Sequence, residues 1–296
     1  PYEWKNVQIV GGGFCDGIVF HPPAPGVRYA RTDMGGAYRW DAAADRWMPL
    51  LDFVSYADNN LVGVESIAVD PLDPKTVYLD CGTYTSSTNG AIFYSHDGGL
   101  TFGRTDVPFK MGGNENGRGN GERMMVDPNN TDVIYVGTRQ AGLWMSDDKA
   151  RSFRRVDSFD EALAPYLPKE MTSMEIRQSI GCGVVFVVFD PQSGKPGNGS
   201  QTIFVGYSQM NRANMFVSRD GGRSRKAMEG APLQYMPNHA AISSDRCLYV
   251  TYGTNPGPQT MRDGGLWKYD IAKDKWTEIT PDKPSGDRPF AYVGVS

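Results

Sequence analysis

Short apolar runs that end in Asp-Pro recur along the chain and give it a loose internal repeat. Three runs have this form, at residues 67–71, 125–128 and 188–191, and residues 18–22 are a variant with His in place of Asp. Further apolar runs follow at residues 77–80, 133–138, 203–206 and 248–251. Short apolar runs bounded by turn residues are typical of buried strands. The pattern therefore predicts many short β-strands.

A polar hairpin follows the third predicted strand of three repeats, at residues 95–102, 146–153 and 218–225. Its pattern, Ser-x-Asp-x-Gly-x-Thr-aromatic, is that of the Asp-box hairpin of several β-propeller families. In this hairpin the aspartate accepts hydrogen bonds from turn amides, the glycine takes a positive φ, and the aromatic ring packs between neighbouring sheets. We therefore expect Asp97, Asp148 and Asp220 to be structural and not catalytic.

The repeats divide the chain into five predicted blades, at about 17–49, 65–108, 122–157, 183–227 and 239–280. Residues 291–295 are interpreted as the opening strand of a sixth blade, and Trp4 as part of a strand that closes the ring. The Asp-Pro marks are 57 and 63 residues apart, more than the roughly 40–50 residues of a minimal blade. The surplus is assigned to loops at residues 112–123 and 161–179. A propeller that stops on an opening strand has an open edge, so residues 1–296 are expected to be an incomplete N-terminal propeller of a longer protein.

Composition agrees with an all-β fold and narrows the range of partners. The 296 residues include 35 glycines, 20 prolines and 11% aromatic residues, a mixture that suits short strands joined by tight turns. The formal net charge is only −4, and no basic block is present to neutralise phosphates, so nucleic acid is not expected as a partner. No run of about 18 apolar residues predicts a membrane span.

The cysteines and histidines give no support to a metal site or a nucleophilic site. Cys15, Cys81, Cys182 and Cys247 lie far apart without a CxxC pair, so we expect buried thiols with at most one disulfide. The three histidines do not cluster in the sequence. No metal or organic cofactor is predicted.

One carboxylate, Asp33, lies between a strand-like run and a pair of glycines in the segment Tyr29–Trp40. Glycines allow a sharp turn and leave room for a bulky ligand. A carboxylate at a strand end, flanked by aromatic rings, suits chemistry on a sugar. From these residues alone, an aspartate that caps its own turn is the commoner outcome.

Six segments in order along the chain resemble the N-terminal propeller of family 74 glycoside hydrolases: residues 11–14, 30–40, 63–68, 108–114, 119–123 and 137–139. The resemblance covers nearly the whole chain and is densest before about residue 157. It implies two seven-bladed propellers with a substrate cleft between them, and cleavage of the β-1,4-glucan backbone of xyloglucan with inversion. The family takes one catalytic aspartate from each propeller, and its Arg-Thr-Asp-x-Gly-Gly-Ala motif, which carries the general base, falls on Asp33.

The resemblance also implies that half of the chemistry lies elsewhere. The family's general acid sits in a Gly-Asp segment of the second propeller, and no matching segment occurs in these 296 residues. Inverting hydrolysis needs a base that activates water and an acid that protonates the leaving oxygen, with the carboxyl groups roughly 6.5–9.5 Å apart. The chain is therefore expected to supply the Asp33 half of the cleft, and the choice between endo and exo cleavage is left open.

Further residues near these motifs are predicted to assist Asp33 or to bind sugar. Arg31 and Arg39 are candidates to keep Asp33 ionised, as a base must be near neutral pH. Amide groups suit hydrogen bonds to sugar hydroxyls and flat rings suit stacking on sugar faces; these candidates are Asn59, Asn60, Asn114, Asn120, Tyr38, Tyr56, Tyr84 and Tyr207. Glu122 and Arg123 are interpreted as a structural pair. The tryptophans at 40, 47, 144, 267 and 276 are interpreted as packing between blades.

A rival hypothesis keeps the fold without the chemistry: a non-catalytic Asp-box propeller that binds a glycan or a protein. A sialidase is a weaker third option, because that chemistry needs three arginines around a carboxylate and a tyrosine nucleophile, and no early Phe-Arg-Ile-Pro-like segment is present. The primary hypothesis is a secreted hydrolase without a cofactor. Its expected partners are xyloglucan or xyloglucan oligosaccharides and a second propeller of the same protein.

Overall fold

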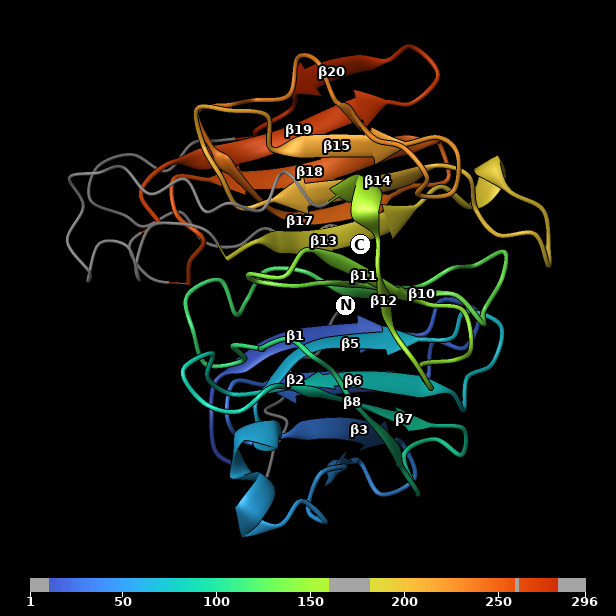
Figure 1. The fold of residues 1–296 in the computed structure, drawn as a ribbon, viewed down its shortest axis with the longest axis vertical. Helices are drawn as coiled ribbons and strands as arrows, with labels where there is room; N and C mark the ends of the chain where they lie inside the picture. The colour runs from blue at the N-terminus through green and yellow to red at the C-terminus, as the bar shows by residue number, and fades with distance from the viewer. Residues whose placement is uncertain (1–10, 160–181, 259–260, 282–296) are drawn as a thin grey trace, which may run out of the picture.

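The computed structural model describes residues 11–159, 182–258 and 261–281. These residues form five four-stranded antiparallel sheets, each with its strands in chain order (Figure 1). They are the blades of a β-propeller, so the predicted all-β fold class is confirmed. The opening strand predicted at 291–295, the strand predicted around Trp4 and the loop at 161–179 lie outside the described residues.

The blades follow the predicted repeats within a few residues. Blade one comprises β1 (Cys15–Phe20), β2 (Arg28–Thr32), β3 (Ala37–Asp41) and β4 (Arg46–Pro49), and blade two comprises β5 (Val64–Val69), β6 (Val77–Cys81), β7 (Ala91–Ser95) and β8 (Gly103–Asp106). Blade three comprises β9 (Met124–Val126), β10 (Ile134–Gly137), β11 (Leu143–Ser146) and β12 (Arg154–Arg155). Blade four comprises β13 (Val184–Phe189), β14 (Ile203–Tyr207), β15 (Met215–Ser218) and β16 (Lys226–Ala227). Blade five comprises β17 (Met236–Ile242), β18 (Cys247–Gly253), β19 (Gly264–Asp270) and β20 (Lys275–Glu278).

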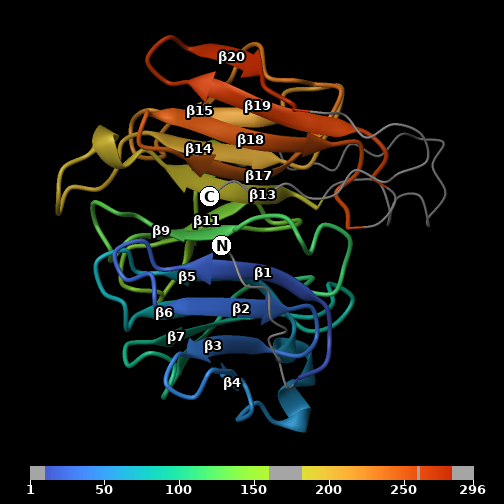
Figure 2. The ribbon, with the colours of Figure 1, turned by 180° about the vertical axis from the view of Figure 1, so that it is seen from behind.

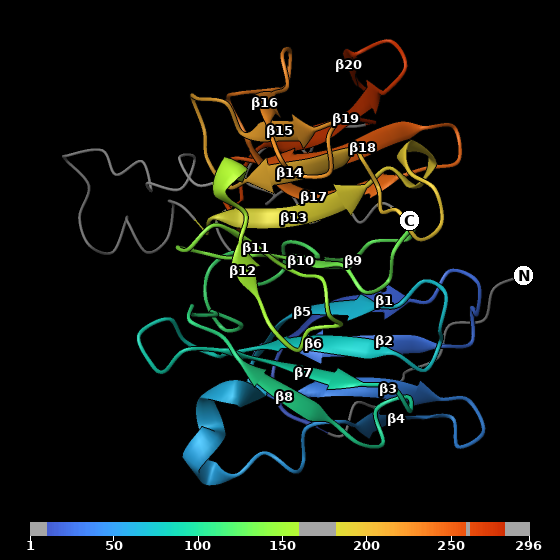
Figure 3. The same cartoon turned by 45° about the vertical axis from the view of Figure 1, so that its right-hand side comes forward.

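The first strand of each blade lies innermost, and neighbouring first strands contact one another, as β1 does β5 and β13 does β17. Figure 2 shows β1, β2, β3 and β4 following one another outward. Among the residues that the structure describes, short 3-10 helices occur at η1 (Tyr56–Val62), η2 (Asp157–Phe159) and η4 (Pro191–Ser193). Figure 3 shows η1, which joins blades one and two, at the edge of the molecule.

Most of the apolar core lies between blades, and one small cluster lies within blade one. Each of four clusters joins two adjacent blades, as Phe204 of blade four does with Tyr269 of blade five, whose ring centroids are 6.0 Å apart. Trp267 and Trp144 pack between blades as predicted, the Trp144 ring 5.0 Å from that of Phe109, whereas Trp40 and Trp47 pack against each other within blade one, 5.4 Å apart. Burial of a large aromatic side chain contributes about 2–3 kcal/mol, so these faces hold the blades together.

The three predicted Asp-box hairpins share one hydrogen-bond pattern. Asp97 Oδ1 accepts from the amides of Leu100 and Thr101, at 3.0 and 2.9 Å, and Oδ2 accepts from the Thr101 hydroxyl at 2.6 Å. Asp148 and Asp220 bind Ser152 and Ser224 in the same way. The expectation that glycine supplies the positive φ fails in the second hairpin. There Lys149 and Ala150 take φ values of 61° and 66°.

The strand-ending turns also repeat. Asp70 Oδ1 accepts from the Leu72 amide at 2.8 Å, and His21 Nδ1 accepts from the Ala24 amide at 3.1 Å. His21 Nε2 further lies 2.9 Å from the Asp70 carbonyl oxygen. The histidine therefore replaces the aspartate as a turn cap and joins blade one to blade two.

All four cysteines are free thiols. Three are buried as expected, but Cys15 is exposed, since it begins the strand β1, whose alternate side chains face outward. In the part of the chain that the structure describes, no helix has both the length and the apolar character needed to cross a membrane.

Candidate active site

Asp33 lies in the turn between β2 and β3 and is clamped by the N-terminal segment. Its amide donates to the Phe14 carbonyl at 3.1 Å, and its Oδ1 accepts from the Phe14 amide at 2.7 Å. Two glycines permit this approach: a Cβ at Gly13 would lie 2.6 Å from Asp33 Oδ1, and a Cβ at Gly35 would lie 1.7 Å from the Gly12 carbonyl oxygen. The glycine run at residues 11–13 therefore serves close contact with the Asp33 turn. The Asp33 side chain is 7% exposed.

The cation nearest to Asp33 is Arg118, which comes from the loop at residues 112–123. Its Nε lies 3.5 Å from Asp33 Oδ2 and 3.7 Å from Asp16 Oδ1. Its guanidinium also lies over the Phe14 ring, 5.6 Å from the centroid. Arg118 therefore lies within ion-pair distance of both carboxyl groups.

Arg31 and Arg39 were predicted to be the counter-charges of Asp33, but both guanidinium groups donate to other acceptors. Arg31 is wholly buried and donates to Glu122 Oε1 at 2.9 Å and to the Arg118 carbonyl at 2.7 Å. Arg39 donates to the Gly98 carbonyl in the Asp-box turn of blade two, at 2.7 Å. Arg31 therefore positions the backbone of the 112–123 loop, whereas Arg39 joins blades one and two.

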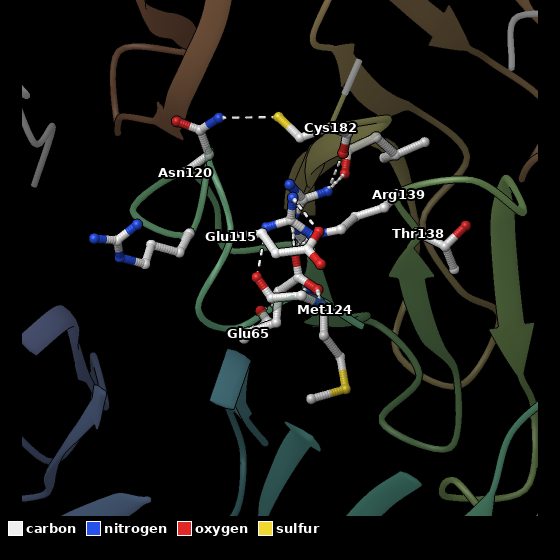
Figure 4. A network of polar contacts seen from close by, with 12 residues as sticks. Glu65, Glu115, Asn120, Met124, Thr138, Arg139 and Cys182 are labelled. Atoms are coloured by element: carbon white, nitrogen blue, oxygen red, sulfur yellow. Dashed lines mark hydrogen bonds and ion pairs between the residues drawn. The ribbon is translucent and has the colours of Figure 1, made fainter. Parts of the chain in front are cut away.

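A second buried arginine holds the same loop from the other side. Arg139 donates to the carbonyls of Gly112 and Asn116, at 2.8 and 2.7 Å, and its Nε lies 2.5 Å from Glu65 Oε1 (Figure 4). Glu65 Oε2 accepts from the Gly112 amide at 2.6 Å. Burial alone would raise the pKa of Glu65, but the guanidinium groups of Arg139 and Arg123 hold it below its ordinary value. The loop that carries Arg118 is thus fixed by charged groups of three blades.

Glu122 and Arg123 are structural, as predicted, but they do not pair with each other. Glu122 pairs with Arg31 and accepts from the Ser66 hydroxyl at 2.7 Å. Arg123 pairs with Glu65 at 2.9 Å. Successive residues of an extended segment point to opposite sides, which is why each finds its own partner.

Several predicted sugar ligands prove to be buried and already hydrogen-bonded. Asn120 is wholly buried and contacts Cys182 and Asn238, and Asn60 is buried against Thr88. Tyr38 is buried, and its hydroxyl donates to the Gly35 carbonyl at 2.7 Å. A ring or amide in this state offers no face to a sugar. The predictions for Asn60, Asn120 and Tyr38 are therefore corrected to structural roles, as is that for the buried Tyr207.

Other candidates are exposed close to Asp33. Asn114 Nδ2 donates to the Tyr84 hydroxyl at 2.7 Å and lies 3.9 Å from Met34 Sδ, next in sequence to Asp33. Phe14 and Met34 are each 50% exposed and Tyr84 is 40% exposed. We call Phe14, Met34, Tyr84 and Asn114 the rim. Asn59 and Tyr56 are exposed on η1.

Comparisons with known proteins find relatives along the whole chain. Residues 236–283, which include blade five, match the Kelch motif. A xyloglucanase from Paenibacillus sp is 42% identical over 302 residues, covering 100% of this chain and 29% of the relative. An oligoxyloglucan-reducing end-specific xyloglucanase from Emericella nidulans is 40% identical over 298 residues, covering 95% and 34%. The crystal structure of a GH74 xyloglucanase from Xanthomonas campestris superposes with a TM-score of 0.85 at 44% identity, covering 97% of this chain and 40% of that one.

The chain is homologous to part of a family 74 xyloglucanase. It spans about a third of the length of the two curated xyloglucanases above. In the described residues, no group of three or more His, Cys, Asp or Glu side chains is arranged to hold a metal ion.

The resemblance to family 74 pointed to Asp33 but not to Asp16 as a residue near the site. The internal repeat, however, contains a pattern that marks Asp16. An acidic residue stands five positions before the turn that ends the first strand: Asp16 before His21, Glu65 before Asp70, and Glu122 before Asp127. Asp16 and Glu65 are each the extra residue of a β-bulge, between Cys15 and Gly17 and between Val64 and Ser66. Bulges redirect a side chain, and here they direct carboxyl groups to the buried arginines.

Proposed function

We propose that the chain supplies one half of the catalytic site of a xyloglucan-hydrolysing enzyme, with Asp33 as the general base. The whole-chain identity to xyloglucanases supports the substrate class. The clamped Asp33 carboxylate, whose side chain is 7% exposed and lies beside Arg118, supports the role of Asp33. Because the chain spans about a third of its relatives, the proposal takes the acid from a second propeller of the same protein.

The geometry suits activation of a water molecule. The Phe14 amide donates a hydrogen bond to Asp33 Oδ1 at 2.7 Å and fixes the plane of the carboxylate. Oδ2 lies 3.5 Å from Arg118 Nε, which is longer than a hydrogen bond, and this oxygen is proposed to bind the water molecule. Oδ2 would accept a proton as the water oxygen attacks the anomeric carbon, on the face opposite the leaving oxygen, which inverts the configuration. Asp16 cannot be the acid, since its side chain is wholly buried and cannot reach a leaving oxygen.

The rim is proposed to contact the sugar chain. The Tyr84 hydroxyl accepts from Asn114, so its ring is held in place and offers an exposed edge and face. Apolar CH faces of sugar rings stack on such aromatic surfaces at low entropy cost. Asn59 is proposed as a more distant hydrogen-bonding residue. Because a polysaccharide of this size does not enter cells, the proposal includes secretion.

Replacement of Asp33 by Asn in the complete protein tests the base. Loss of a general base costs about 10²–10⁴-fold in rate, so the rate of reducing-sugar release from xyloglucan should fall by that amount. Circular dichroism should show an unchanged fold. Asp157→Asn, which alters a side chain that is 93% exposed in blade three, should hydrolyse xyloglucan at the normal rate.

Binding and stereochemistry separate this proposal from the non-catalytic propeller. Titration calorimetry with xyloglucan oligosaccharide should show that Asp33→Asn still binds, and proton NMR of the first product of the unaltered protein should show the inverted anomer. Hydrolysis at the ordinary rate by Asp33→Asn would refute the assignment. Binding without hydrolysis by the unaltered complete protein would favour a binding module.

A further inference from the structure

Asp16 is a buried carboxyl group with an incomplete set of partners. Its side chain has no exposed surface although its backbone is partly exposed, because the bulge in β1 turns it inward. Within the described residues, neither of its carboxyl oxygens has a hydrogen-bond donor. A buried polar group in this state carries a large free-energy cost when it is ionised.

The equivalent residues of blades two and three show what Asp16 lacks. Glu65 accepts from Arg139 and from the Gly112 amide, and Glu122 accepts from Arg31 and Ser66. Both are glutamates, so their carboxyl groups reach one methylene further than that of an aspartate. The shorter Asp16 side chain does not come within hydrogen-bond distance of an arginine: its Oδ1 lies 3.7 Å from Arg118 Nε, and the two atoms form no hydrogen bond.

The groups around Asp16 come from three segments. Arg31 lies on β2, Asp33 follows β2, and Arg118 and Glu122 lie on the 112–123 loop. Burial raises the pKa of Asp16 to about 7; Asp33 and Glu122 act in the same direction, and Arg31 and Arg118 oppose them. Asp16 therefore changes charge near neutral pH.

Two further titratable groups adjoin this cluster. His239 of β17 lies 2.9 Å from the Gly121 carbonyl through Nδ1, and burial followed by the Arg31 charge lowers its pKa. Cys15, next to Asp16 in sequence, is exposed at the surface as a residue, but partial desolvation raises the pKa of its thiol. Both groups are therefore uncharged at the pH at which Asp16 ionises. Neither of them changes the charge of this cluster near neutral pH.

We propose that Asp16 is a positioning residue that controls, through Arg118, how strongly Asp33 is neutralised. When Asp16 is protonated, Arg118 is the counter-charge of Asp33 alone. When Asp16 ionises, Arg118 lies between two negative carboxylates, so less of its positive charge compensates Asp33. The inference rests on the proposed role of Asp33, and it makes the base respond to pH through a residue that never touches substrate.

Carbon NMR of protein labelled at the aspartate carboxyl carbons tests the coupling without any turnover. The resonances are assigned with Asp16→Asn and Asp33→Asn, and the pH is varied from 4 to 9. The Asp33 resonance should show a step near pH 7 that coincides with the step of Asp16. In Asp16→Asn the step at Asp33 should vanish, whereas in Asp157→Asn it should remain.

Arg118→Gln provides an independent variant. Since Arg118 lowers the pKa of Asp16, its removal should move the Asp16 step to higher pH. An Asp33 resonance without a step near pH 7 in the unaltered protein, or a step that survives Asp16→Asn, would overturn the proposal. The unaltered protein decides the question even if a variant fails to fold. The result is also independent of whether Asp33→Asn abolishes hydrolysis, so the two proposals can fail separately.

Discussion

Within the N-terminal segment, the contact with Asp33 depends on the missing side chain of one glycine. Gly13 has a φ of 102°, a conformation that L-residues rarely adopt, and its α-carbon faces Asp33 Oδ1. Its neighbour Gly12 has no atom within 4 Å of where a Cβ would stand. The two glycines are adjacent, but only Gly13 is required by the contact with Asp33.

Alanine at these two positions separates site geometry from chain flexibility. Gly13→Ala should lower the free energy of unfolding by about 1 kcal/mol or more. Displacement of a reacting group by about 1 Å costs on the order of 10²-fold in rate, so its kcat on xyloglucan should fall by that order. Gly12→Ala should leave both quantities unchanged. Equal rates for the two variants would show that the contact between Gly13 and Asp33 does not matter.

At the scale of the hairpin, the Asp boxes are stabilised by local hydrogen bonds that depend on an ionised aspartate. Hydrogen bonds from the hydroxyl and amide of Ser224, and from the Ser218 hydroxyl, lower the pKa of Asp220 to about 2. A carboxyl group with a lowered pKa stabilises the fold at pH values above its ordinary pKa. The contribution is lost as pH falls through the folded value.

Asp220→Asn should therefore destabilise the protein at pH 6, and the difference from the unaltered protein should shrink between pH 4 and pH 2. Urea unfolding at several pH values measures this difference. Asp157→Asn, an exposed aspartate outside the Asp boxes, should give no such convergence. A difference that stays constant down to pH 2 would mean that Asp220 acts through its shape and not through its charge.

The local character of these hairpins explains what could be predicted from sequence. The strand-ending turns and the Asp boxes rest on hydrogen bonds between residues two to four apart, which a short motif encodes, and the blades pair strands that are neighbours in sequence. Arg31 meets Arg118 and Asn120 across 87 and 89 positions, and Asn238 meets Asn120 across 118. Such partners depend on how whole blades adjoin. The sequence therefore indicated that Arg31 matters near Asp33 and misassigned what it binds.

At the scale of the molecule, one buried carboxylate connects three blades. Glu65 of blade two accepts from Arg139 and pairs with Arg123 of blade three, and Arg123 donates to the Cys182 carbonyl just before blade four, at 2.7 Å. Removal of one member of a buried ion network leaves uncompensated charge in the interior. Glu65 therefore stabilises blade contacts as well as the 112–123 loop.

Glu65→Ala should lower the free energy of unfolding by about 3–5 kcal/mol, because two buried guanidinium groups lose their counter-charge. Chemical denaturation followed by tryptophan fluorescence measures the loss. Glu229→Ala, at a side chain that is 89% exposed, should change stability by less than about 0.5 kcal/mol. A loss of similar size in both variants would contradict a central role for Glu65.

Arg31 of blade one and Arg139 of blade three both bind the backbone of the loop that places Arg118 beside Asp33. The acidic motif in blade one consequently lacks its counter-ion when it is taken out of this context. If the hairpin that contains Asp33 were moved to another scaffold, the aspartate would be transferred without the positive charge of Arg118. A designer who wants this reactivity must transfer at least three sheets in their mutual register.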